Sequence, residues 1–195
     1  SDEPMVVELS VLENDTRTEN NHIQIGEHMA LYPYCVYEYQ VKKGYSEPTD
    51  NAKVNHTYYP IISNSHPYIA ELATLSEKYG ALKDVPDAEW PEVKDFVVLV
   101  KTESFRTIGA IPDYSEVESS IQGLVINRIS ELDEEEKRLV SESFPALDLN
   151  KIIILEEGRK PSSSLKSFGM MGGGVVIGLL GVASFFGGGR RETLS

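Results

Sequence analysis

The sequence predicts an α+β fold, with a predominantly antiparallel sheet and two helices, followed by one C-terminal transmembrane helix. Short segments of alternating apolar and polar residues recur between residues 5 and 157, separated by Gly, Pro and polar residues, which is typical of strands joined by turns. Two longer segments carry the spacing and end signals of amphipathic helices. Residues 168–189 hold 22 uncharged residues, enough to span a bilayer as a helix.

Four strands are expected in the first third of the chain. The segments 5–12 and 22–25 are short apolar candidates, and polar residues 13–21 join them. The segment 34–41 is rich in strand-forming residues, and 53–62 is expected to return beside it as a hairpin partner. One half-buried face of segment 34–41 is expected to hold Cys35, Tyr37, Tyr39 and Val41.

A helix is expected after this hairpin. Either Asn64 or Ser65 is suitable as its N-cap, Pro67 fits its first turn, and Gly80 is suited to end it. Helical spacing places the apolar residues of this segment on one face, namely Ile69, Leu72, Leu75 and Tyr79.

The second half of the chain is expected to hold more strands and a second helix. The strands are expected at residues 95–102, 104–111, 120–129 and 150–157. The helix is expected at 132–144, where Asp133 and Glu136 occupy the two positions of a capping box and Pro145 ends the helical pattern. The order of three strands, a helix and further strands also fits an alternative fold, a small OB-type barrel.

The apolar segment divides the chain into four parts. These are an extramembrane domain (1–157), a polar linker (158–167), the transmembrane helix (168–189) and a short cytoplasmic tail (190–195). Nine glycines make a water-exposed helix improbable here, whereas lipid enforces the helix because it offers the backbone no other hydrogen-bond partner. Arg190 and Arg191 directly after the span, together with the large acidic N-terminal part, place the domain outside the cytoplasm.

Some of the glycines in this segment have the spacing of a helix-packing interface. Four-residue spacing relates Gly169 to Gly173 and Gly174 to Gly178, which favours close approach of a second membrane helix. Two alternatives stay open: the glycines have no packing role, or the whole segment is a glycine-rich linker of a soluble protein.

Charge and motif content exclude several classes of protein. The formal net charge of −13 repels phosphate backbones, so nucleic acid is not expected as a partner. The sequence has no nucleotide-binding loop, zinc-protease motif or nucleophile-elbow motif. We therefore assign no catalytic residue and expect no cofactor.

A competing hypothesis is a metal-binding or enzymatic domain built on histidine-rich strands. His22, His28, His56 and His66 all lie in the first third of the chain, with Cys35 and Glu27 as further potential ligands. Their spacing matches no known ligand signature. A Cys–His dyad of Cys35 with His56 is the less favoured interpretation, because Cys35 is expected on a buried face, where a thiol is inert.

Ten tyrosines suggest an interaction surface. Six of them cluster around the expected hairpin and are candidates for an interaction face: Tyr32, Tyr34, Tyr37, Tyr39, Tyr58 and Tyr59. The leading hypothesis is thus a single-pass membrane protein that acts as a non-enzymatic binding or assembly component. Its expected partners are membrane lipid and either other membrane subunits or a second copy of itself.

Overall fold

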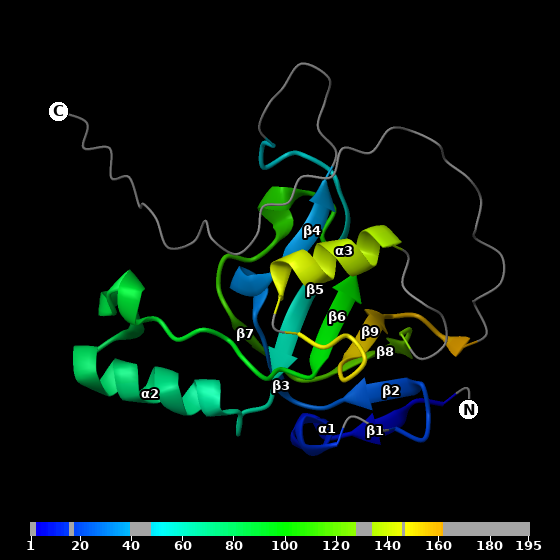
Figure 1. The fold of residues 1–195 in the computed structure, drawn as a ribbon, viewed down its shortest axis with the longest axis horizontal. Coiled ribbons are helices and arrows are strands. Elements are labelled where there is room, and N and C mark those ends of the chain that lie inside the picture. Colours follow the sequence, from blue (N-terminus) through cyan, green and yellow to red (C-terminus); the bar gives the residue numbers. More distant parts are fainter. Residues whose placement is uncertain (1–2, 16–17, 40–47, 128–133, 146, 162–195) are drawn as a thin grey trace.

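The computed structural model describes residues 3–15, 18–39, 48–127, 134–145 and 147–161 (Figure 1). Three α-helices lie in these ranges: α1 (Leu9–Asn14), α2 (Pro67–Tyr79) and α3 (Glu134–Ser143). The strands are β1 (Met5–Val7), β2 (His22–Ile25), β3 (His28–Ala30), β4 (Val36–Tyr39), β5 (Val54–Ile62), β6 (Val98–Thr102), β7 (Glu116–Glu118), β8 (Ile121–Val125) and β9 (Ile153–Glu157). The α+β class is therefore confirmed.

All nine strands belong to one mixed sheet. Its order is β1-β2-β8-β9-β6-β5-β3-β7, and β4 pairs with β5 beside this path. The pairs β1–β2 and β6–β9 are parallel, and the other pairs between described strands are antiparallel. The predicted hairpin is confirmed as β4 and β5, with Val36 opposite Tyr58.

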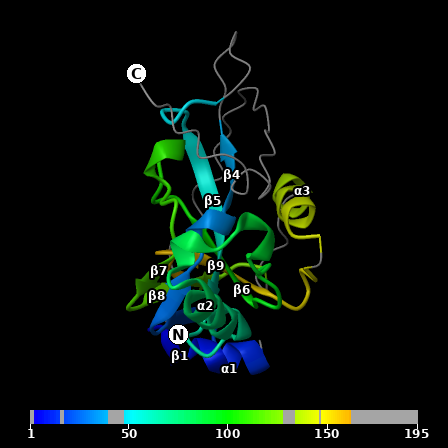
Figure 2. The ribbon, with the colours of Figure 1, turned by 90° about the vertical axis from the view of Figure 1, so that its left-hand side faces the viewer.

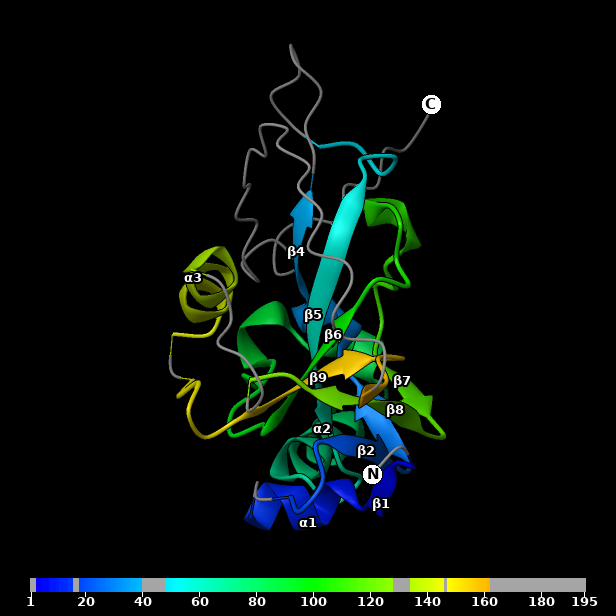
Figure 3. The same ribbon diagram turned by 90° about the vertical axis from the view of Figure 1, so that its right-hand side faces the viewer.

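The sheet curls into a half-barrel. Only Gly26 and Glu27 separate β2 from β3 along the chain, yet four strands lie between them in the sheet order. The path from β2 to β3 must therefore bend back on itself. The β4–β5 hairpin projects beyond the curled part with α3 beside it, while α1 and β1 lie at the other end of the molecule (Figures 2 and 3).

Both faces of the central strands are buried. The inner face of the half-barrel carries the apolar side chains Ile23, Ile61, Val98, Val100, Ile153 and Leu155. The outer face packs against α2 and α3 through Tyr58, Leu99, Ile154, Tyr68, Leu139 and Val140. Full burial of an aliphatic side chain contributes about 1.5–3 kcal/mol, so Leu139 and Val140 together stabilise the packing of α3 on the sheet by about 3–6 kcal/mol.

Helix α2 begins with a different cap from the predicted one. The His66 imidazole accepts a hydrogen bond from the Tyr68 amide (3.2 Å) and caps the helix. Neither Asn64 nor Ser65 does so, because the Asn64 amide donates to Glu27 and the Ser65 hydroxyl bonds to Ser63. The predicted end is confirmed: Gly80 has φ of 83°, which glycine adopts without steric cost.

Two predicted strands are wrong in part or in whole. Residues 5–12 form a strand only as far as Val7, after which Leu9 and Leu12 lie three residues apart on the buried face of α1. Residues 104–111 form a 3-10 turn and a single bridge instead of a strand. The reason is that β5 and β9 already occupy both edges of the preceding strand β6.

The predicted membrane segment cannot be compared with the fold. The span at 168–189 and the tail at 190–195 lie outside the described residues, and the linker is described only to residue 161. Within the described ranges, no helix has the length and apolar character that crossing a membrane requires.

Candidate functional site

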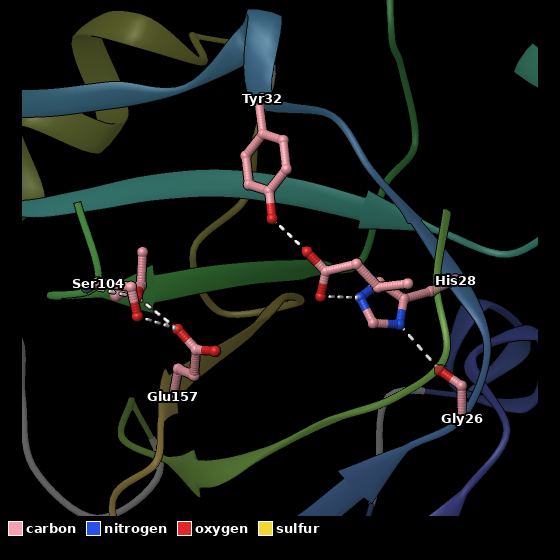
Figure 4. A network of polar contacts seen from close by, with 7 residues as sticks. Gly26, His28, Tyr32, Ser104 and Glu157 are labelled. Carbon is pink, nitrogen blue, oxygen red and sulfur yellow. Dashed lines mark hydrogen bonds and ion pairs between the residues drawn. The ribbon is translucent and has the colours of Figure 1, made fainter. Parts of the chain in front are cut away.

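A polar row crosses three strands at one end of the half-barrel. Thr57 of β5 lies opposite Thr102 of β6 in the antiparallel register, so both side chains are on the same, inner face. The parallel register of β6 with β9 places Glu157 next in the row, and the Thr102 hydroxyl donates to Glu157 Oε2. The Ser104 hydroxyl donates to the same oxygen (3.2 Å; Figure 4).

A second carboxylate comes from the edge strand β7. The register places Glu118 opposite His28 of β3. The Tyr32 hydroxyl donates to Glu118 Oε1, and His28 Nε2 lies 3.6 Å from Oε2 (Figure 4). His28 Nδ1 donates to the Gly26 carbonyl (2.8 Å), which can only accept. The Nε2 atom is buried and makes no hydrogen bond within the described chain.

Two tyrosines lie beneath these carboxylates. The rings of Tyr32 and Tyr59 are 4.7 Å apart, and Phe105 meets the Tyr32 ring edge-on at 5.4 Å. Burial raises the pKa of both tyrosine hydroxyls, and the negative charge of Glu118 raises it further. Both hydroxyls therefore remain protonated and can act as hydrogen-bond donors at neutral pH.

We call this arrangement the acidic mouth, which consists of His28, Tyr32, Thr57, Tyr59, Thr102, Glu118 and Glu157. Its outer part reaches solvent: Glu157 is exposed and the Glu118 side chain is 26% exposed. Its inner part does not, since Tyr59 is 2% and Thr57 0% exposed. The Thr57 hydroxyl is buried and has no hydrogen-bond partner within the described ranges, which costs about 1–3 kcal/mol.

Basic residues near the mouth are engaged elsewhere. Lys101 neighbours Thr102 but points to the outer face, where it pairs with Glu136 of α3. Arg159 pairs with Glu156, the residue before Glu157. Neither carboxylate of the mouth pairs with a lysine or arginine of the described chain, so the site attracts cations.

A second polar cluster joins α3 to the outer face. Glu136 accepts hydrogen bonds from Tyr58 (2.8 Å) and Lys101. Burial opposes the ionised carboxylate, but the bonds from Lys101 and Tyr58 outweigh it and hold the Glu136 pKa below its usual value. All three groups satisfy one another, as expected of a structural contact.

The four histidines lie in separate settings. His22 accepts from the Gln122 amide (3.0 Å), His56 packs edge-on against the Tyr58 ring, His66 caps α2, and His28 belongs to the mouth. No group of three His, Cys, Asp or Glu side chains in the described part of the chain is arranged to hold a metal ion. The structure thus does not gather the histidines as the competing hypothesis requires.

Burial raises the pKa of the Cys35 thiol to about 12. The thiol is therefore protonated near neutral pH and is a poor nucleophile, which agrees with the prediction of an inert cysteine.

The six predicted tyrosines do not form one exposed face. Tyr32, Tyr39, Tyr58 and Tyr59 are buried. Tyr32 and Tyr59 belong to the core on the inner face, and Tyr58 belongs to the core on the outer face. Tyr34 and Tyr37 are half-buried, and the Tyr34 hydroxyl bonds to that of Tyr68 (3.0 Å). The glycines predicted to pack against a second helix, Gly169, Gly173, Gly174 and Gly178, lie outside the described residues.

Comparison with protein families, curated proteins and solved structures finds no match for this chain. The mouth is therefore characterised by its own geometry. The sequence interpretation missed both of its carboxylates and both of its threonines, although Thr102 and Glu157 are the final residues of two predicted strands, 95–102 and 150–157. The polar residues at the ends of these two strands were the signal in the sequence that could have indicated the site.

Proposed function

We propose that this chain is a membrane-anchored, non-enzymatic binding component whose acidic domain engages a partner at the acidic mouth. Residues 168–189 span the membrane and hold residues 1–157 outside the cytoplasm. The observation that carries the proposal is the pair Glu118 and Glu157. Both belong to the acidic mouth, reach solvent and have no lysine or arginine partner in the described chain.

The contacts of the mouth support binding over catalysis. His28 is completely buried, and its two nitrogens face the Gly26 carbonyl and Glu118, so the ring is fixed in place and has no access to a substrate. Ser104 bonds to a carboxylate and not to an imidazole, which leaves its hydroxyl without the base that activates a serine. These groups position the carboxylates.

We also propose that the half-barrel is a variant of the OB-type barrel. If β2 and β3 are counted as one bent strand, that strand pairs with β5 at one end and with β8 at the other. The strands β6 and β9 lie between β5 and β8 and pair with each other. A five-stranded, partly open barrel of this kind typically acts as a binding module. The net charge of −13 favours a basic partner over an oligonucleotide.

Extraction and co-purification test this proposal. The full chain is expected to resist a carbonate wash and to retain a basic partner in mild detergent at low salt. Replacement of both carboxylates, Glu118→Gln with Glu157→Gln, should release that partner, whereas the exposed neighbour Glu103→Gln should not. A washed chain found in the soluble fraction refutes the membrane anchor, and retention of the partner by the double variant refutes the binding site.

Gly174→Leu with Gly178→Leu tests the membrane segment separately. This variant should weaken co-purification of a membrane subunit or of a second tagged copy, because a larger side chain prevents close helix approach. The basic partner should stay bound, since the mouth is unchanged. Undiminished co-purification of every membrane partner counts against a glycine interface.

A further inference from the structure

We propose that the acidic mouth recognises an alkylammonium group, either the side chain of a lysine on a partner protein or the end of a polyamine. This inference rests on the proposed function and specifies its ligand chemistry. It starts from the unused hydrogen-bonding capacity of the mouth. Glu157 Oε2 accepts from Thr102 and Ser104, and no hydrogen bond from the described chain reaches Oε1.

A buried hydroxyl provides the second indication. Thr57 is 0% exposed, no group in the described part of the chain bonds to its Oγ1, and it shares the inner face with Thr102. A ligand that donates a hydrogen bond there would satisfy this group. Burial raises the pKa of the neighbouring Tyr59 hydroxyl, and the charges of Glu157 and Glu118 raise it further.

The geometry favours an ammonium over a guanidinium. A guanidinium binds best when both oxygens of one carboxylate are free for its parallel donors. In the mouth, Tyr32 occupies Glu118 Oε1, His28 faces Oε2, and two hydroxyls occupy Glu157 Oε2. An ammonium instead has three donors that point in different directions, which suits single acceptors on separate strands.

The surrounding rings suit the alkyl chain of such a ligand. Tyr32, Tyr59 and Phe105 form a continuous aromatic group. Tyr32 and Tyr59 are buried, so the half-buried Phe105 is the ring that offers apolar contact to methylenes and cation–π attraction to the charge. Hard metal ions, in contrast, prefer oxygen ligands and gain nothing from neighbouring aromatic rings. No three-residue metal group occurs in the described chain.

Calorimetric titration of the full chain in mild detergent tests the inference. The probes are Nα-acetyl-lysine amide and spermidine for the two sources, Nα-acetyl-arginine amide for the fork-shaped cation, and tetramethylammonium for a cation without donors. We expect saturable binding of at least one of the first two and clearly weaker binding of the others. Glu157→Gln should weaken the bound probe about tenfold, and Glu103→Gln, which removes an exposed charge close by, should change it less than twofold.

The variant Thr57→Val separates an effect on ligand binding from an effect on folding. It removes only the unpartnered hydroxyl, so it should leave the melting temperature unchanged or raise it, while it weakens the ammonium probe several-fold. Equal affinity of the Glu157→Gln and Glu103→Gln chains, or equal binding of the arginine and lysine amides, overturns the inference. If a basic partner still requires Glu157 while neither ammonium probe binds, the ammonium inference fails and the proposed function stands.

Discussion

Gly123 is the residue at which an added methyl group is expected to do most harm. It lies on β8 opposite Glu157 of β9, and a Cβ at this position would be 2.2 Å from the Glu156 carbonyl oxygen. Such contacts are essentially never shorter than 3.0 Å, so β9 would have to move by about 0.8 Å. Overpacking of this kind costs about 1–3 kcal/mol, and one lost ladder hydrogen bond adds about 1 kcal/mol.

We therefore expect Gly123→Ala to lower the free energy of unfolding by about 2–4 kcal/mol, or the melting temperature by roughly 5–15 °C. The assay is thermal unfolding of the full chain in detergent, followed by far-UV circular dichroism. Gly26→Ala is the matched control, because its Cβ would meet only the Glu8 carboxylate at 3.8 Å. A melting temperature of Gly123→Ala within 2 °C of the control would refute the close approach of β9 to β8.

Three other predictions concern stability. Above about pH 9 the free energy of unfolding should fall, because Cys35, with its pKa raised to about 12, and Tyr59, also raised, keep protons that the unfolded chain releases; urea titrations across this range measure the effect. Glu136→Gln should lower the free energy of unfolding by about 2 kcal/mol at neutral pH. Because the Glu136 pKa is lowered in the fold, the parent loses this contribution as the pH falls below about 4.5, and the variant should lack that loss. The exposed Glu134→Gln should show neither effect, and acid titration of the three chains compares them. Gly80→Ala should lower the free energy of unfolding by about 1 kcal/mol at φ of 83°, measured by the same urea titration.

Local signals explain which parts of the fold the sequence predicted. Helix α2 was predictable because Pro67 and Gly80 mark its two ends within a single segment. The β4–β5 hairpin was predictable because both strands are rich in residues that favour a sheet. Neither inference needed knowledge of distant residues.

Long-range pairing explains what the sequence could not predict. Glu118 belongs to β7, a three-residue strand in which an exposed valine stands between two glutamates. Its partner His28 is 90 positions earlier, and the pairing exists only because the sheet curls. The expected strand at 104–111 is absent for the same reason, since occupancy of both edges of β6 is a property of the whole sheet.

Two of the four buried side-chain atoms that have no hydrogen-bond partner in the described chain belong to the mouth, namely Thr57 Oγ1 and His28 Nε2. A buried hydroxyl without a partner costs stability that a valine of the same shape would avoid, and Thr57 is such a hydroxyl. The two carboxylates of the mouth also have no lysine or arginine partner in the described chain, whereas the inner face away from the mouth is apolar. Departures from optimal packing and pairing are expected where a ligand completes the bonding. A bound cation should consequently stabilise the fold through these same groups, so that ligand affinity and the melting temperature rise together.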